Sequence, residues 1–213
     1  MATPPCPVTR PAWGDHLPQK EQVVTRRPRK PPPPPPPPGR RAGPDGGDEG
    51  ARAIEDDDVI ALEGEPRIQL RALHTPGHAL GHLCFHDEDR GVLLTGGNIV
   101  GLGSVLIDPP QGNMRDYLDS LERMRSLPNL TVLLGGHGPA IATPYQKIDE
   151  YISHRLERER NILEAVQAGS TTPKEIVEKV YTDVSPKAHG MAERAVLAHL
   201  EKLKDEGKLN LEL

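Results

Sequence analysis

The chain of 213 residues has few aromatic side chains, few cysteines and no long apolar run. Aromatic residues make up 3% and hydrophobic residues 35% of the sequence, which is little for one core that spans the whole chain. The two cysteines, Cys6 and Cys84, suggest neither a disulfide framework nor a paired-cysteine zinc site, and they fit a reducing cytoplasm. No apolar run approaches the roughly 18 residues of a membrane span, and the N-terminus lacks the apolar stretch of a secretory signal. We therefore expect a cytoplasmic protein with no membrane partner.

The sequence also has no excess of basic residues over acidic ones. The formal net charge is −5 at pH 7, which gives no general attraction to nucleic acid or to an anionic membrane. The first fifty residues hold 15 of the 24 prolines and cannot bury enough apolar area to offset the entropy lost on ordering. Residues 1–53 are therefore predicted to be a disordered Pro/Gly-rich segment. A polyproline II spacer, a ligand for proline-binding domains, a basic nucleic-acid arm and a misread gene start all remain open.

From about residue 54 the pattern becomes regular. Four short strands with period-two alternation are predicted in "DDDVIAL", "RIQLRAL", "HLCFH" and "GVLLTG". A helix is predicted from an N-cap at Asn113 to about Ser126, with Asp116 at its third position. Its apolar stripe consists of Met114, Tyr117, Leu118, Leu121, Met124 and Leu127. The run "TVLL" predicts a buried strand that ends at "GGHGP".

The last third of the chain is predicted to be helical. Three helix starts are indicated by a Ser or Thr before a proline: Thr143-Pro144, Thr172-Pro173 and Ser185-Pro186. The first two carry a Gln or Glu three residues on, as in a capping box, and the first and third helices are predicted to end at Gly169 and Gly207. The tail "KLNLEL" alternates like a strand. Three helices and a strand in about 70 residues predict a winged helix-turn-helix domain over residues 146–213.

Three motifs stand at predicted strand ends: "HTPGH" at 74–78, "LLTGGNIVG" at 93–101 and "GGHGP" at 135–139. In this order and spacing they resemble the second half of the metallo-β-lactamase superfamily. The run "GNMRDYLDSLERM", the helix "KIDEYISHRLERERNIL" and the helical tail resemble the branch of the β-lactamase-like endoribonuclease, which appends a winged helix. The resemblance covers about residues 54–213. It implies an α/β (α+β) fold: the C-terminal half of an αββα sandwich over residues 54–145, followed by the winged-helix domain.

The resemblance also implies a metal site. In that family two zinc ions lie between the halves of the sandwich, and the second half supplies a histidine, an aspartate and a second histidine. By the match, His78 and His137 are the metal ligands, whereas Gly97 occupies the position of the bridging aspartate and Asn98 beside it is a weak replacement. The His-x-His-x-Asp-His cluster of the first half is absent, since the only histidine before residue 74 is His16. We therefore expect weak or absent zinc binding.

The other candidate residues are predicted to have structural roles. His74 and His82 flank the first motif and are predicted to support the site. Four further histidines are predicted to be surface or helix-packing residues: His86, His154, His189 and His199. Asp108, in "LIDPP", is predicted to cap its loop and not to bind metal.

The function implied by the resemblance is metal-dependent hydrolysis of a phosphodiester or a thioester, with single-stranded RNA or a small ester or thioester as substrate. Because most ligands are missing, the chain is predicted to be inactive as it stands. Three explanations stay open: a first half lost by truncation, frame error or a misplaced start; a degenerate, non-catalytic binding protein that uses its winged helix and proline-rich tail; and a half-enzyme that docks with a separate first-half domain and is completed in trans. A homo-oligomer stays open as an alternative partner. Half a sandwich exposes one sheet face, so residues 54–145 are predicted to fold poorly alone.

Overall fold

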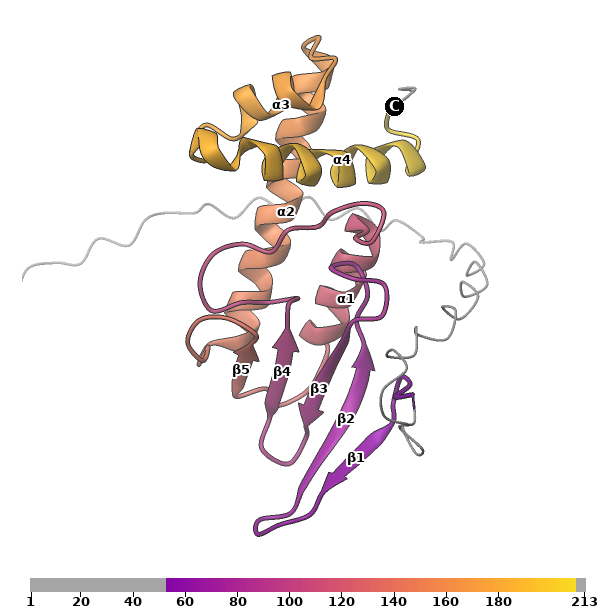
Figure 1. Ribbon diagram of the computed structural model, residues 1–213, viewed down its shortest axis with the longest axis vertical. Coiled ribbons are helices and arrows are strands. Elements are labelled where there is room, and N and C mark those ends of the chain that lie inside the picture. The colour runs from indigo at the N-terminus through magenta and orange to yellow at the C-terminus, as the bar shows by residue number, and fades with distance from the viewer. Residues whose placement is uncertain (1–52, 210–213) are drawn as a thin grey trace, which may run out of the picture. The chain divides into compact units, whose positions relative to one another are not determined.

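The computed structural model describes residues 53–209 (Figure 1). The prediction that residues 1–53 are disordered falls almost wholly outside the described residues, and so does most of the strand predicted in "KLNLEL". None of the helices between residues 53 and 209 combines the length and the apolar character needed to cross a membrane.

A five-stranded sheet forms the first part of the described chain, in the order β1-β2-β3-β4-β5. Its strands are β1 (Val59–Leu62), β2 (Ile68–His74), β3 (Leu83–Asp87), β4 (Val92–Gly96) and β5 (Val132–Gly135). The first four pair antiparallel, whereas β4 and β5 pair parallel because helix α1 (Met114–Arg125) lies between them in the chain. All five strands lie where the sequence predicted them.

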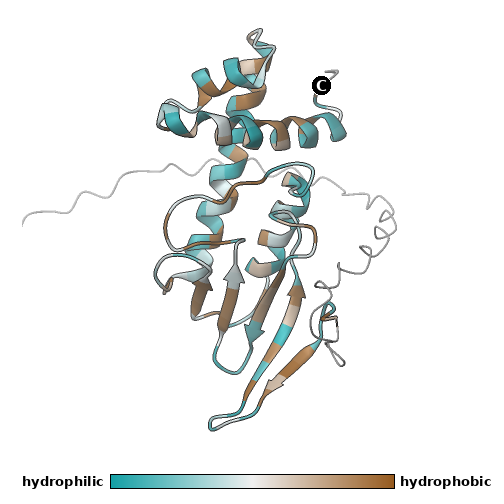
Figure 2. Cartoon of the chain, in the orientation of Figure 1, coloured by the Kyte–Doolittle hydropathy of each residue, from teal (hydrophilic) through white to brown (hydrophobic). Residues whose placement is uncertain are grey.

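Two helices bury one face of this sheet. Helix α1 begins after the predicted N-cap, and the Oδ1 of Asn113 accepts hydrogen bonds from the backbone N–H groups of Arg115 and Asp116 at 2.9 and 3.0 Å. The stripe of α1 packs with α2 (Pro144–Gln167) against one inward side chain from each of four strands: Leu73, Cys84, Leu93 and Leu133. Figure 2 shows the hydrophobic residues of strands and helices. The predicted apolar stripe of α1 is confirmed.

The second core is helical. Helices α2, α3 (Pro173–Val180) and α4 (His189–Asp205) surround it, and a 3-10 turn, η1 (Pro186–Ala188), precedes α4. Its fully buried members include Ile162, Ile176, Val177, Val196 and Leu203. Helix α2 contributes side chains to both cores, because its N-terminal half packs on the sheet and its C-terminal half on α3 and α4.

Of the three helix starts predicted at a Ser or Thr before a proline, only the one at Thr172 has a side-chain cap. The Thr172 hydroxyl accepts from the Glu175 N–H at 3.3 Å, while the Glu175 carboxylate accepts from the N–H of Thr171 at 2.8 Å. Thr143 directly precedes α2 as predicted, whereas Ser185 precedes the 3-10 turn η1 and α4 begins only at His189. Neither the Thr143 nor the Ser185 side chain makes a capping hydrogen bond. The capping box predicted at Thr143 was therefore wrong, although the helix start was right.

Candidate functional site

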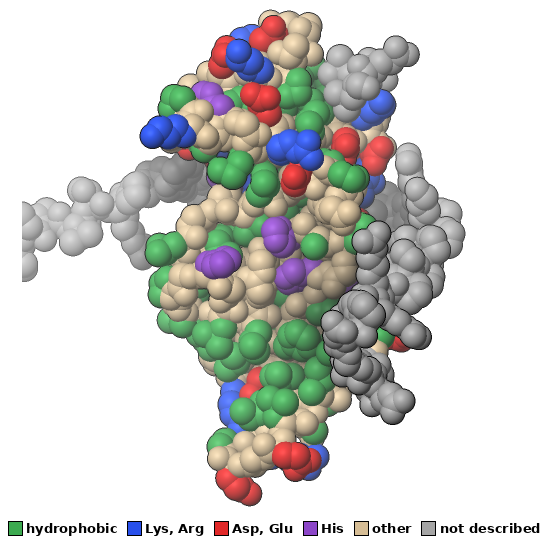
Figure 3. Space-filling view, in the orientation of Figure 1, with side chains coloured by type: hydrophobic (Ala, Val, Ile, Leu, Met, Phe, Trp, Pro, Cys, Tyr) green, Lys and Arg blue, Asp and Glu red, His purple; other side chains and the backbone are tan. Residues whose placement is uncertain are grey.

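Three loops meet at one edge of the sheet. Strands β2 and β4 run in the same direction because both are antiparallel to β3, and β5 is parallel to β4. The loops that follow β2, β4 and β5 carry His78, Gly97 and His137, so the fold brings the three motifs of the sequence to the same edge. Figure 3 shows histidine side chains gathered on one face of the molecule, above a hydrophobic surface.

His78 lies against Gly97. Its Nδ1 is 3.0 Å from the carbonyl oxygen of Leu106, and since a carbonyl only accepts, Nδ1 carries the proton and Nε2 has a free lone pair. A Cβ built on Gly97 would lie 2.7 Å from this Nε2 and 2.6 Å from Cδ2 of the same ring. The His78 ring therefore occupies the space that a side chain at position 97 would need.

His82 supports the same loop. Its Nε2 accepts a hydrogen bond from the N–H of Gly97 at 3.2 Å, and its Nδ1 lies 3.0 Å from the Thr75 hydroxyl, which in turn donates to the Cys84 sulfur at 3.2 Å. Burial, and then the nearby His78, lower the pKa of His82 to about 4, so the ring is neutral at pH 7. Both ring nitrogens are engaged within the fold, which agrees with the supporting role predicted for this residue.

His137 and Asn98 differ in burial. His137 is exposed, and its carbonyl oxygen accepts from the N–H of Gly101 at 2.8 Å, while its ring makes no hydrogen bond to residues 53–209. Asn98 is fully buried, and its amide nitrogen donates to the carbonyl of Thr75 at 2.8 Å. The interpretation of Asn98 as a replacement for the missing carboxylate was therefore wrong, because its side chain points into the protein.

The ligand set within the described residues is incomplete. Between residues 53 and 209 no three His, Cys, Asp or Glu side chains lie together as a metal site requires. His78 offers one nitrogen, His82 offers none, and Gly97 offers no carboxylate. A catalytic zinc normally has three protein ligands, so these residues do not by themselves fit the metal.

The outcome differs among the other predicted residues. His86 is 1% exposed and lies on β3, where alternation places it on the same face as Cys84, so of the two predicted alternatives a surface position is excluded. His199 is buried between helices, as predicted. Asp108 does not cap its loop with its side chain; its carboxylate accepts from Nε of Arg194 in α4 at 2.5 Å.

Helices α2 and α4 hold the loop that carries Leu106. The buried guanidinium of Arg155 donates to the carbonyl of Val105, and the hydroxyl of Tyr151 donates to the carbonyl of Val100 at 3.2 Å. With Arg194 on Asp108, these contacts fix the loop whose Leu106 carbonyl orients His78. Arg155 was not predicted from the sequence, although it stands at helical spacing from the buried Tyr151, where a charged residue signals a buried polar contact.

Comparison with known families agrees with this fold. A model of the Metallo-beta-lactamase superfamily matches residues 2–137, and one of the Beta-lactamase associated winged helix domain matches residues 172–210. The chain belongs to the metallo-β-lactamase superfamily, and the prediction of that fold with a C-terminal winged helix is confirmed. The first match begins at residue 2, so the predicted start of the resemblance at about residue 54 was wrong.

Individual relatives are similar over part of their length. Beta-lactamase-like protein 2 homolog of Caenorhabditis elegans is 32% identical over 140 residues, covering 65% of this chain and 45% of that protein. The atrochrysone carboxyl ACP thioesterase of Aspergillus chevalieri is 34% identical over 153 residues, covering 66% and 47%. A metallo-beta-lactamase family protein from Thermus thermophilus superposes with a TM-score of 0.62 at 31% identity, covering 72% and 49%. The chain thus spans about half the length of these relatives.

Proposed function

We propose that this chain contributes one half of a metal-dependent hydrolase site that acts on a small ester or thioester. The observation that carries the proposal is the edge of the sheet at which His78, Gly97 and His137 meet. A relative named as a thioesterase favours a thioester substrate. Zinc is the proposed metal because imidazole ligands suit it, and the missing ligands have to come from outside residues 53–209.

An RNA substrate is the weaker alternative within the same proposal. From residue 155 to the end, ten lysines and arginines stand against eleven acidic residues. A domain that binds RNA through its phosphates normally has a basic excess, so the winged helix is better suited to serve as a wall or a packing element. The contacts of Arg155 and Arg194 with the loop at residues 104–109 support the packing role.

A second candidate is a non-catalytic binding protein. The specific observation in its favour is the His78 ring in the space of the missing side chain at Gly97, with Nδ1 held by Leu106. A site kept for catalysis would leave that space for a carboxylate. The two candidates differ in whether hydrolysis can be restored.

Restoring the missing ligands tests the proposed function. Gly97→Asp alone is expected to displace the His78 ring and to add one ligand, without measurable thioester hydrolysis, because a catalytic zinc needs three protein ligands. Gly97→Asp combined with the first half of the Caenorhabditis elegans relative is expected to hydrolyse a small acyl thioester when zinc is added. The measurement is the initial rate of thiol release.

The matched control is the same combination with His78→Ala, which should return the rate to background. If the combination leaves the thioester intact and cleaves single-stranded RNA, the RNA alternative replaces the proposal. Inactivity on both substrates, with the two halves shown to be associated, supports the non-catalytic protein.

A further inference from the structure

One face of the sheet has no helix against it among residues 53–209. Side chains alternate along a strand, so the residues next to the core positions Cys84, Leu93 and Leu133 point to the opposite face. The strand register joins them into one row: Ala72, Phe85, Leu94 and Leu134. Figure 3 shows hydrophobic side chains gathered over the sheet below the histidines.

We call this surface the open face and define it by Leu70, Phe85, Leu94, Val132 and Leu134. None of these five belongs to either hydrophobic core, and Leu134 is 40% exposed. A contiguous apolar surface of this kind on a folded protein marks an interaction site.

The open face is nearly free of charge. Among the described strand residues that share its orientation, the one carboxylate is that of Asp87, and its Oδ2 accepts from Arg90 at 2.8 Å. The one histidine is His74, whose Nε2 bonds to the carbonyl of Leu80 at 2.9 Å. A surface without unpaired charges can pack against a second copy of itself, because a twofold axis then brings no like charges close to each other.

The composition of the first fifty residues, which precede the described part of the chain, does not favour strands or apolar rows that would match this sheet. The first fifty residues hold 15 of the 24 prolines and one aromatic residue, Trp13. Proline lacks the N–H group that strand pairing requires, and so few large apolar side chains cannot match the rows of the sheet.

We propose that a second copy of this chain covers the open face, with the two sheets packed against each other about a twofold axis. Such a pair has the layer order helix, sheet, sheet, helix, in which each row meets the same row of its partner. Each open face thereby packs against an apolar face of the same composition. The proposal goes beyond the hydrolase assignment and does not depend on it.

Light scattering after size-exclusion chromatography tests the pairing on the full chain, without substrate and with a chelator present. The wild type is expected to have the mass of two chains at about 10 µM. Leu134→Glu places two carboxylates in the apolar interface and should weaken pairing about 100-fold or more. Leu156→Glu is the matched control, since Leu156 is 48% exposed on α2, away from the open face, and it should leave the mass unchanged. Circular dichroism shows that each variant is folded.

A wild type that stays monomeric at about 100 µM overturns the proposal and leaves the open face to residues 1–52 or to another protein. A dimer that Leu134→Glu leaves intact, or that Leu156→Glu separates, also overturns the proposal. Large aggregates without a discrete dimer overturn it as well. The first half in the thioester experiment would use the same face, so mass and hydrolysis are measured separately. A failed dimer leaves the proposed function standing, and failed hydrolysis leaves the dimer standing.

Discussion

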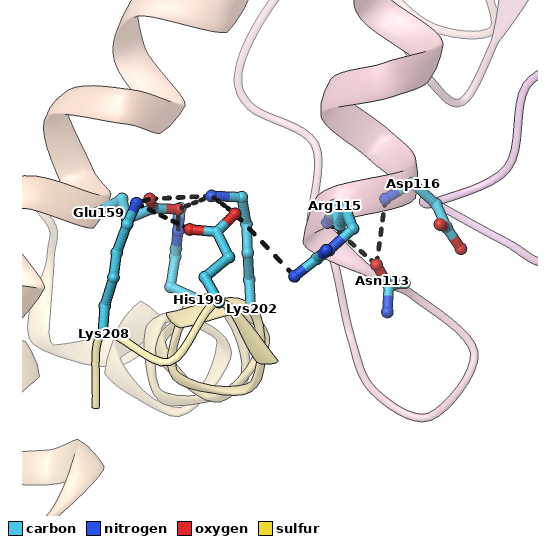
Figure 4. A network of polar contacts seen from close by, with 8 residues as sticks. Asn113, Arg115, Asp116, Glu159, His199, Lys202 and Lys208 are labelled. Atoms are coloured by element: carbon cyan, nitrogen blue, oxygen red, sulfur yellow. Dashed lines mark hydrogen bonds and ion pairs between the residues drawn. The ribbon is translucent and has the colours of Figure 1, made fainter. Parts of the chain in front are cut away.

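Replacing Glu159 by alanine is expected to lower the free energy of unfolding by about 3 to 5 kcal/mol. Glu159 and Lys202 are 6% and 9% exposed, and the lysine ammonium lies 2.8 and 2.9 Å from the two carboxylate oxygens (Figure 4). His199 is fully buried beside them, with Nδ1 at 3.6 Å from the carboxylate. Without Glu159 the charge of Lys202 stays buried, but Glu206 remains as its partner at 3.0 Å. The loss of unfolding free energy should therefore lie toward the lower end of this range.

Denaturant titration measures this loss, and Glu157→Ala is the control because Glu157 is exposed on the same helix. The control should change stability by no more than about 0.5 kcal/mol. Equal effects of the two substitutions would show that the contact between α2 and α4 does not depend on the buried ion pair.

The same carboxylate gives a dependence on pH. Burial acts to raise the pKa of Glu159, but His199 and the Lys202 ammonium outweigh it and hold the pKa at about 2, against an ordinary value of 4.5. A lowered pKa contributes stability that is fully present above the unfolded value and is lost as the pH falls toward the folded value. Wild type should therefore lose stability between about pH 4.5 and 2, and Glu159→Gln should lose less over that range.

Replacing Gly77 by alanine is expected to cost about 3 kcal/mol or more. Gly77 has φ +119, a conformation that side chains disfavour, and an added Cβ would lie 2.2 Å from the backbone nitrogen of Tyr117 in α1. The loop cannot easily move away, because the Gly77 carbonyl accepts from the N–H of Asn113 at 2.8 Å and the Ser120 hydroxyl donates to the Pro76 carbonyl at 2.7 Å.

Gly190→Ala is the matched control for this substitution. Gly190 lies in α4 with open space where a Cβ would stand, and alanine favours a helix by about 1 kcal/mol over glycine. Thermal and denaturant unfolding should show a large loss for Gly77→Ala and no loss for Gly190→Ala. A Gly77→Ala protein as stable as wild type would contradict the close packing of the motif loop on α1.

The sequence predicted those parts of the fold in which one local signal dominates. Alternation located the strands, and the Asn113 cap with its apolar stripe located α1, since both depend on neighbouring residues. The buried charges were not predicted, because Arg155 and Glu159 are paired with Val105 and Lys202, which lie far away in the sequence. Residue type alone predicts that Arg155 and Glu159 are exposed to solvent. Their burial depends on contacts between segments that are far apart in the sequence.

The candidate site was predicted in position but not in detail. The three motifs follow strands that run in the same direction, and strand direction alone decides at which edge of the sheet each loop lies. His78, Gly97 and His137 therefore lie at one edge. No sequence pattern showed that the His78 ring fills the space beside Gly97 or that Asn98 turns inward, because both follow from packing between separate loops.

The zinc content of the dialysed full-length chain, read together with thioester hydrolysis, tests the central claim most directly. The claim is that one chain supplies only part of a metal centre, through His78 and His137. We predict less than one tightly held zinc ion per chain and hydrolysis at the background rate. Two tightly held ions per chain, with zinc-dependent hydrolysis that either His78→Ala or His137→Ala abolishes, would contradict it.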